Sequence, residues 1–336
     1  MKRKFALIIV LLLTALTVAG CGNNGLVDYK KAVDKTDQIE KGQSSGEFTL
    51  NLDFNTDGMS QEDIAEMNYY KEMTGSFQST FDDKSNQMIA RNYLNLGGLG
   101  FDLDYYQNGN EMFFKLPIIG KYMKMNEVIE SMGEQQGGED FSQFISEETL
   151  QALSREWIAL LNKENVFKGK DIILTTPDGE VKTTVYTITI NDEQFQTLAS
   201  NAMNILSKDE NLKSNFYSVI EKKNGQALTN ESCFDEFFAN AIKQMEKDHL
   251  VNFKYTAYVD IDGYIVNETI TFKITRDALE QGEPKEISFN LDLRNWDINQ
   301  QQKFEFPELT GENTLKTEDL DETMPSIFKN MFQKNQ

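Results

Sequence analysis

The sequence predicts an α+β fold in which helices cover one face of a large antiparallel sheet. Three observations predict it: segments with alternating apolar and polar residues, Gly-containing turn dipeptides between them, and separate stretches with a helical apolar stripe. The predicted elements follow the order strands, helices, strands, helices, strands, helix. This order lacks the strand–helix–strand alternation that builds parallel sheets.

Composition excludes several classes of protein. The 336 residues are 39% hydrophobic and 26% charged, which is typical of a folded chain and excludes disordered and collagen-like proteins. A formal net charge of −21 repels phosphate backbones, so nucleic acid is not an expected partner. One histidine and two cysteines provide few side chains for soft-metal sites, disulfides or histidine-based acid–base chemistry.

The N-terminus has the pattern of an export signal. Lys2, Arg3 and Lys4 precede an apolar stretch from Phe5 to Thr17, which ends in small residues. This stretch is shorter than the roughly 20 residues that span a bilayer as a helix, so a permanent transmembrane anchor is the weaker alternative.

The sequence Val18-Ala19-Gly20-Cys21 resembles the lipobox of bacterial lipoproteins. The resemblance implies that residues 1–20 are a lipoprotein signal peptide and that Cys21 is acylated, anchoring the chain on the outer face of the cell membrane. An ordinary secretory signal with a chance cysteine is the alternative. Residues 21–25 would form a short acylated tether. Residues 26–336 would form a single α+β domain, for which two hairpin-rich halves, 26–163 and 164–336, are an alternative description.

The first predicted elements surround one clear strand. Leu26 to Lys41 has a thin apolar side typical of an amphipathic helix, and Gly42 to Gly46 is expected to interrupt regular structure. Glu47 to Phe54 alternates with a period of two, which predicts a strand. A helical insertion is expected over Ser60 to Met73, before a strand over Phe77 to Phe81.

Turn dipeptides predict three hairpins. A two-residue turn at Asn108-Gly109 would place these pairs on one face: Tyr105 with Met112, Leu103 with Phe114, and Phe101 with Leu116. A turn at Asp262-Gly263 would place these pairs on one face: Val259 with Val266, Tyr255 with Ile270, Phe253 with Phe272, and Val251 with Ile274. Asp178-Gly179 predicts a third hairpin, and Ile287, Phe289, Leu291 and Leu293 predict a further strand.

Four segments carry apolar stripes that suit helices lying on a sheet. They are Ser146 to Leu161, Asn191 to Leu206, Ser232 to Leu250 and a segment near Glu318 to Phe332. Asn191 and Gln194 form the pattern of a capping box at the start of the second.

No pattern of catalytic residues is present. The chain lacks G-x-S-x-G, H-E-x-x-H, Walker-type and dinucleotide-binding motifs. The lone His249 is expected at a helix end in a structural role, and Cys233 is expected to be a buried apolar residue. We therefore expect a protein that is not an enzyme and has no metal site or cofactor.

The unusual feature is the aromatic content of the predicted sheet, since the chain has 23 Phe, 12 Tyr and 13 Met. Two interpretations stay open: a core filled by the helices, or a cavity that accepts acyl chains. In the second case the candidate ligand-binding residues are Phe101, Leu103, Tyr105, Met112, Phe114, Phe253, Tyr255, Ile270, Phe272, Phe289 and Leu291.

The lipobox, the helix after it, and the segments Tyr106–Lys115, Lys121–Met125, Val185–Ile190 and Tyr258–Ile265 together resemble the LolA/LppX-like superfamily and similar uncharacterised lipoproteins of Gram-positive bacteria. The resemblance implies an incomplete, strongly curved β-barrel closed by helices around a hydrophobic cavity. A lipid or glycolipid ligand is then the leading hypothesis, with the protein acting as carrier or sensor. The alternative is a filled core and a partner protein of the cell envelope. The chain departs from smaller members by its length and by the helical block from Asn191 to Leu250.

Overall fold

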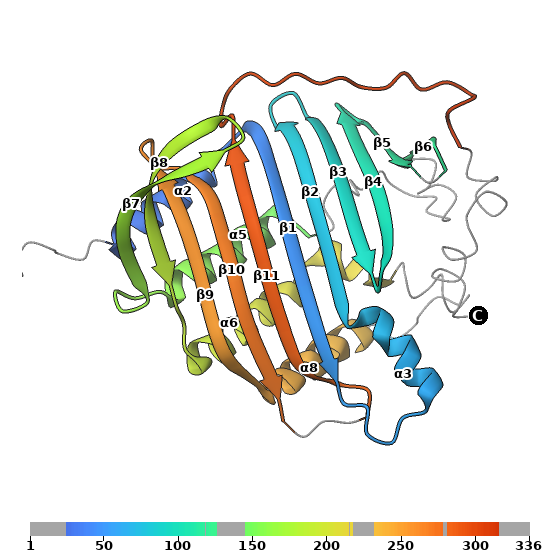
Figure 1. The fold of residues 1–336 in the computed structure, drawn as a ribbon, viewed down its shortest axis with the longest axis vertical. Coiled ribbons are helices and arrows are strands. Elements are labelled where there is room, and N and C mark those ends of the chain that lie inside the picture. The colour runs from blue at the N-terminus through green and yellow to red at the C-terminus, as the bar shows by residue number, and fades with distance from the viewer. Residues whose placement is uncertain are drawn as a thin grey trace, which may run out of the picture.

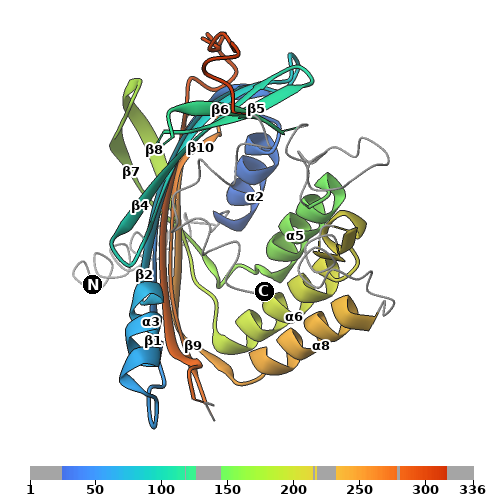
Figure 2. The same cartoon turned by 90° about the vertical axis from the view of Figure 1, so that its right-hand side faces the viewer.

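The computed structural model describes residues 25–117, 119–125, 145–214, 216–217, 232–277 and 281–315. Within them, one eleven-stranded antiparallel sheet forms the body of the molecule (Figure 1). Helices α2, α5, α6 and α8 lie on one side of this sheet (Figure 2). Strands β6 and β7 form the two edges, so the sheet is not closed into a barrel. The predicted α+β class and the antiparallel sheet are confirmed.

The helices among these residues are α2 (Gly25–Thr36), α3 (Gln61–Met67), the 3₁₀ turn η1 (Asn68–Tyr70), α5 (Glu147–Leu160), α6 (Asp192–Leu206) and α8 (Ser232–Met245). The strands are β1 (Lys41–Phe54), β2 (Glu72–Asp82), β3 (Gln87–Leu96), β4 (Leu99–Asn108), β5 (Glu111–Leu116), β6 (Lys121–Lys124), β7 (Val166–Thr176), β8 (Gly179–Ile188), β9 (Asp248–Asp260), β10 (Ile265–Arg276) and β11 (Pro284–Trp296). In the described part of the chain, no helix has the length and apolar character needed to span a bilayer.

Most neighbouring strands are also consecutive in the chain. The sheet order is β6-β5-β4-β3-β2-β1-β11-β10-β9-β8-β7. Only the central β1–β11 pair joins strands from opposite ends of the sequence, with Phe48 opposite Leu291 and Leu50 opposite Phe289. This pair makes the strands of residues 26–163 and those of residues 164–336 into one continuous sheet.

The hairpin between β4 and β5 differs in register from the prediction. The loop is Gly109-Asn110, and Tyr105 lies opposite Phe114 while Gln107 lies opposite Met112. Gly109 has a φ of 62° in the first loop position, the place that glycine occupies in a type II′ turn. The predicted pairs are therefore wrong by two residues along one strand. A shift of two keeps every side chain on its predicted face.

The hairpin between β9 and β10 follows the prediction in its middle. Tyr255 lies opposite Ile270 and Phe253 lies opposite Phe272. Irregularities at both ends then change the partners, so that Val259 lies opposite Ile265 and Ile274 lies opposite Leu250. The predicted pairs of Val259 with Val266 and of Val251 with Ile274 are wrong, because each bulge adds one unpaired residue.

The first strand begins earlier than predicted. Residues Gly42 to Gly46, expected to interrupt regular structure, belong to β1 and pair with β2 and β11. A Cβ atom on Gly46 would lie 2.3 Å from Cε1 of Phe77 and 2.6 Å from Cδ2 of Leu293. Glycine is therefore required at this position because neighbouring side chains pack over its backbone.

The helices start as predicted and most end earlier. Ser146 caps α5, and the reciprocal capping box of Asn191 and Gln194 at α6 is confirmed. Helix α2 ends at Thr36 and α8 at Met245, short of the predicted Lys41 and Leu250. Strand β9 takes up the chain from Asp248. The helix predicted near Glu318 to Phe332 lies outside the described residues.

The main core lies at the β8–β10 end of the sheet. It joins Tyr29 and Ala32 of α2, Leu161 after α5, and strand residues from β7 to β10. Tyr29 is 1% exposed and its ring contacts Tyr186 and Tyr255, with centroids 6.3 and 5.9 Å away. Helix α2 is therefore held by aromatic packing directly onto the sheet.

Candidate functional site

The candidate ligand-binding residues share one face of the sheet. Tyr255 and Phe253 contact Trp157 of α5, with ring centroids 5.9 and 5.8 Å apart, so their face is the one that the helices cover. Following the strand registers from β9 to β6 places Phe101, Leu103, Tyr105, Met112, Phe114, Ile270, Phe272, Phe289 and Leu291 on the same face. We call this the helix-facing sheet surface.

Exposure along this surface changes from one end to the other. Tyr255 is 5% exposed and belongs to the filled core, so it does not line an accessible space. Phe272, Phe289 and Leu291 are half-buried, and Leu103 is 38% exposed. Its neighbour Leu94 on β3, which sequence reasoning did not single out, is also 38% exposed. The surface is thus covered at β8–β10 and accessible toward β3 and β4.

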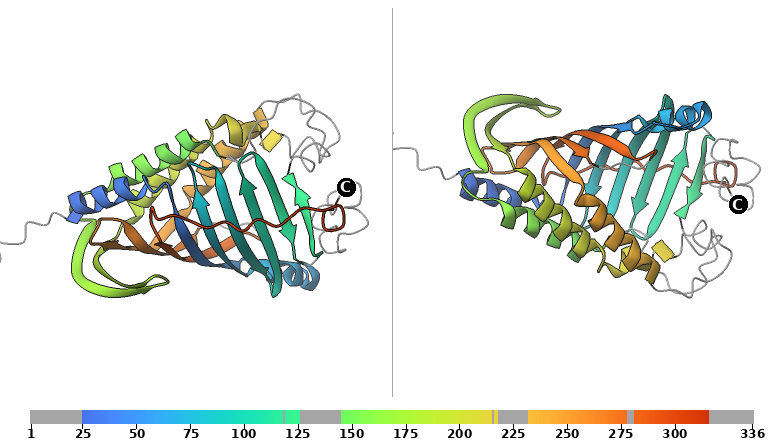
Figure 3. Two further views of the ribbon diagram at one scale, coloured as in Figure 1. Left: turned by 90° about the horizontal axis from the view of Figure 1, so that it is seen from above. Right: turned by 90° about the horizontal axis from the view of Figure 1, so that it is seen from below.

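The helices explain this gradient. Helix α2 packs against β7 and β10, and α6 packs against β9. Trp157 of α5 also contacts β9, and helices α5, α6 and α8 pack on one another. Figure 3 shows the helical layer meeting the sheet near β7–β9 and diverging from it toward β4–β6. Apolar side chains on the central strands are therefore not sealed by the described helices.

An aromatic row crosses the centre of the surface. The ring centroid of Phe289 lies 5.2 Å from that of Phe272 and 6.4 Å from that of Phe48. These three rings connect strands β10, β11 and β1. The Phe48 ring lies over Gly75 of β2, where a Cβ atom would come within 2.3 Å of it. The row therefore forms a continuous apolar floor, of the kind that can contact acyl chains without fixing them by hydrogen bonds.

A polar chain lies at the filled end, and sequence reasoning missed it. Trp157 Nε1 donates to the Tyr29 hydroxyl at 3.0 Å, and the Tyr255 hydroxyl donates to Glu268 Oε2 at 2.6 Å. Burial raises the pKa of Tyr29 to about 12 and also raises the pKa of Glu268. The position of Glu268 could have been predicted from the sequence, because it lies two residues before Ile270 and therefore on the apolar face of β10.

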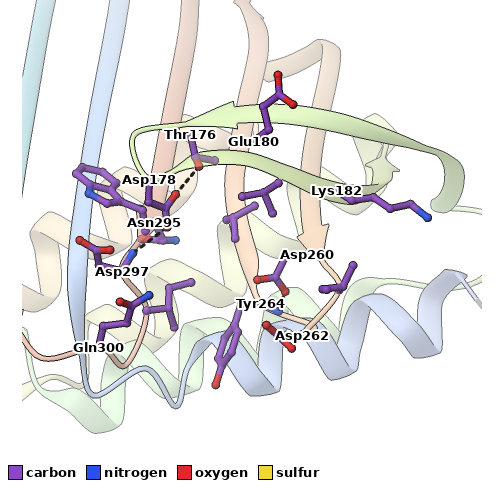
Figure 4. A pocket seen from close by; sticks show the side chains of 15 residues that line it. Thr176, Asp178, Glu180, Lys182, Asp260, Asp262, Tyr264, Asn295, Asp297 and Gln300 are labelled. Carbon is purple, nitrogen blue, oxygen red and sulfur yellow. Dashed lines mark hydrogen bonds between the residues drawn. The ribbon is translucent and has the colours of Figure 1, made fainter.

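A separate polar cleft of about 330 Å³ lies beside the ends of β7, β9 and β11 (Figure 4). Acidic and apolar side chains both line it, and the acidic ones include Asp178, Asp260, Asp262 and Asp297. Asp260 Oδ1 accepts a hydrogen bond from Tyr264 N at 2.8 Å, within the β9–β10 turn. Burial raises the pKa of Asp260. Across the described residues no group of three or more His, Cys, Asp or Glu has a metal-binding arrangement.

His249 lies between two carboxylates at the start of β9. Its ring nitrogens are 3.4 Å from Asp192 Oδ2 and 3.3 Å from Asp277 Oδ2. Asp192 Oδ1 also accepts from Leu250 N at 2.6 Å, which ties the first turn of α6 to the sheet. These contacts place His249 in the α6–sheet junction. The predicted placement at a helix end is wrong, because β9 has already begun. The free Cys233 is only partly buried in α8.

Comparison with known proteins does not assign this chain to a family. No family model matches the chain, and no curated protein is similar to it. One solved structure, a "Beta-barrel-like Protein of Domain of Unknown Function DUF1849 from Brucella abortus", is 10% identical over 77% of this chain and 100% of that chain, with a TM-score of 0.15. A TM-score this low supports no argument about this chain.

Proposed function

We propose that this chain is a membrane-anchored extracytoplasmic lipoprotein that binds a lipid or glycolipid between its sheet and its helices, as a carrier or sensor. The observation that supports it best is the helix-facing sheet surface. Aromatic and aliphatic side chains lie on it from β10 to β5, while helices α2, α5 and α6 pack against strands at the β7–β10 end. An accessible apolar surface of this extent on an acidic protein favours a hydrophobic ligand.

The N-terminal sequence supports the location in this proposal. Cys21 in its lipobox-like context would carry the acyl chains, and the resemblance to LolA/LppX-like lipoproteins belongs to the same proposal. The open sheet is compatible with such a lipid-binding domain. A filled core with an envelope partner protein is the competing interpretation.

Native mass spectrometry with lipid extraction tests the ligand. The chain from Gly22 to Gln336 keeps every described residue and lacks the acyl anchor. It is purified from a bacterial host and weighed. We expect a defined excess mass with identifiable acyl chains, since burial of hydrocarbon retains a lipid through purification. A mass equal to the bare chain would contradict lipid binding and favour the envelope interaction protein.

Two neighbouring residues on β3 provide a matched pair of variants. Leu94 is 38% exposed on the helix-facing surface, and Tyr93 is 39% exposed on the opposite face. We expect Leu94→Asn together with Leu103→Asn to reduce the retained lipid, and Tyr93→Asn to leave it unchanged. Equal lipid content in both proteins would show that the ligand lies elsewhere.

A further inference from the structure

The outer edge of the sheet at β7 is unusually apolar. Among the described strands, β7 pairs with β8 alone and forms one edge of the sheet. Phe167 is 66% exposed, Ile173 is 67% exposed and Ile172 is 40% exposed. The register with β8 places Phe167 and Ile172 on one face of the hairpin and Ile173 on the other. Apolar side chains therefore flank this edge on both sides, next to an irregularity between Lys168 and Asp171 that, with Lys168 and Lys170, disfavours pairing with another strand.

We propose that the β7 edge is the surface by which the protein rests on the phospholipid bilayer. This inference rests on the membrane anchoring in the proposed function. Helix α2 begins at Gly25, four residues after Cys21, and four extended residues reach at most about 14 Å. Helix α2 packs against β7, and Lys168 Nζ lies 2.7 Å from Asp28 Oδ2 of its first turn. An acyl chain on Cys21 would hold β7 close to the lipid headgroups.

Charge favours the same orientation. The whole chain has a formal charge of −21, and an anionic bilayer repels such a protein. The segment from Lys163 to Ile188 contains four lysines and four acidic residues, so it is neutral. Helix α2 contains three lysines and two aspartates. This corner of the molecule therefore carries less negative charge than the chain as a whole, and an anionic surface repels it less than the average of the chain.

The side chains suit an interfacial position. Phenylalanine and isoleucine can enter the boundary between headgroups and acyl chains, while lysines such as Lys168 and Lys170 keep their ammonium groups at headgroup level. The unpaired backbone groups of β7 remain in the hydrated headgroup region, where water and phosphate oxygens can bond them. The bilayer then covers apolar side chains of β7 that are otherwise exposed to water.

Site-specific fluorescence tests the orientation. The acylated full chain, in a Cys233→Ser background, receives one cysteine by Phe167→Cys, Ile173→Cys or, as control, Tyr69→Cys. Tyr69 is 52% exposed on η1, which contacts β2, and five strands separate β2 from β7 in the sheet. Figure 1 shows α3, the helix before η1, on the opposite side of the molecule from β7. Each cysteine is labelled with an environment-sensitive dye, and the protein is reconstituted in vesicles of equal parts phosphatidylethanolamine and phosphatidylglycerol. Quenching by spin-labelled lipid is compared with quenching by aqueous iodide.

At positions 167 and 173 we expect quenching by spin-labelled lipid at least about threefold stronger than at position 69, because interfacial side chains lie within the acyl boundary. Equal quenching at all three positions, in protein that floats with vesicles and carries an acyl chain by mass, would overturn this inference alone. Absence of the acyl chain would overturn the anchor and this inference together. If the protein self-associates in solution and this shields positions 167 and 173 from iodide without vesicles, the partner of β7 is a second copy of the chain. That result would also overturn the inference.

Discussion

Asp209 offers a sharp test of how the helical layer is held together. Asp209 is 3% exposed, and its carboxylate accepts hydrogen bonds from Ser146 N at 2.9 Å, from Ser146 Oγ at 2.6 Å and from Leu212 N at 2.7 Å. Burial alone would raise the pKa of Asp209. The hydrogen bonds from Ser146, Thr149 and Leu212 outweigh it and lower the pKa from 3.8 to about 2. The start of α5 and the turn after α6 thus share one charged acceptor.

The replacement Asp209→Asn removes this charge, so the effect of the lowered pKa can be measured as a change in the free energy of unfolding. A difference of nearly two pKa units corresponds to about 2 kcal/mol, at about 1.4 kcal/mol per unit. A lowered folded-state pKa stabilises the protein above the unfolded-state pKa, and that stability is lost as the pH falls through the folded-state pKa. We expect the variant to be less stable by about 2 kcal/mol at neutral pH, with the difference decreasing from about pH 4 downward.

Equilibrium urea unfolding, followed by circular dichroism at neutral pH and at about pH 2.5, measures this difference. Asp235→Asn is the matched control, since Asp235 is exposed in the first turn of α8. The control should change stability little at either pH. A destabilisation by Asp209→Asn that is equal at both pH values would refute the reasoning, because it would show that the charge contributes nothing.

Three further predictions concern the sheet. Gly46→Ala should lower the free energy of unfolding, measured by heat or urea, by about 1–3 kcal/mol, because its methyl group would overlap the Phe77 ring of β2. Gly311→Ala is the control and should change this free energy little, because the space around Gly311 is open. Arg276→Ala should lower the free energy of unfolding by about 3 kcal/mol, because the 8% exposed carboxylate of Asp248 loses its hydrogen bonds of 2.6 and 3.0 Å from the guanidinium group. An unchanged midpoint of urea unfolding would contradict this prediction. Glu268→Gln should leave the protein at least as stable at neutral pH. A raised folded-state pKa means that stability is lost as the pH rises, so the variant should also flatten the pH dependence above the unfolded-state pKa near 4.5.

Local patterns predicted the elements well because they depend on neighbouring residues. Period-two alternation places every second side chain on one face, so the residues of the helix-facing surface could be assigned together before any register was known. The cap at Asn191 was equally predictable, since its side chain bonds a backbone group three residues away. The same locality explains the early start of β1: five small and polar residues resemble a loop, although pairing on both sides makes them a strand.

Hairpin registers were less predictable, because a turn can close in more than one way. The dipeptide Asn108-Gly109 predicted a loop formed by these two residues. In the structure the loop is Gly109-Asn110, and Asn108 pairs with Glu111 as the last residue of β4. In β9–β10, bulges at the ends shift Val259 and Ile274 by one partner each. A bulge is selected by packing on the sheet, which the pattern of a single strand does not contain.

The sequence by itself determined the α+β class, the face of each central strand, the helix starts and the acidic charge. Only the tertiary structure decided that β1 pairs with β11, that α2 and α6 close one end of the helix-facing surface, and that Tyr29 of α2 packs between Tyr186 and Tyr255. These features join segments far apart in the chain. Their formation depends on which surfaces remain to be buried once local elements exist, and local alternation or capping does not encode that choice.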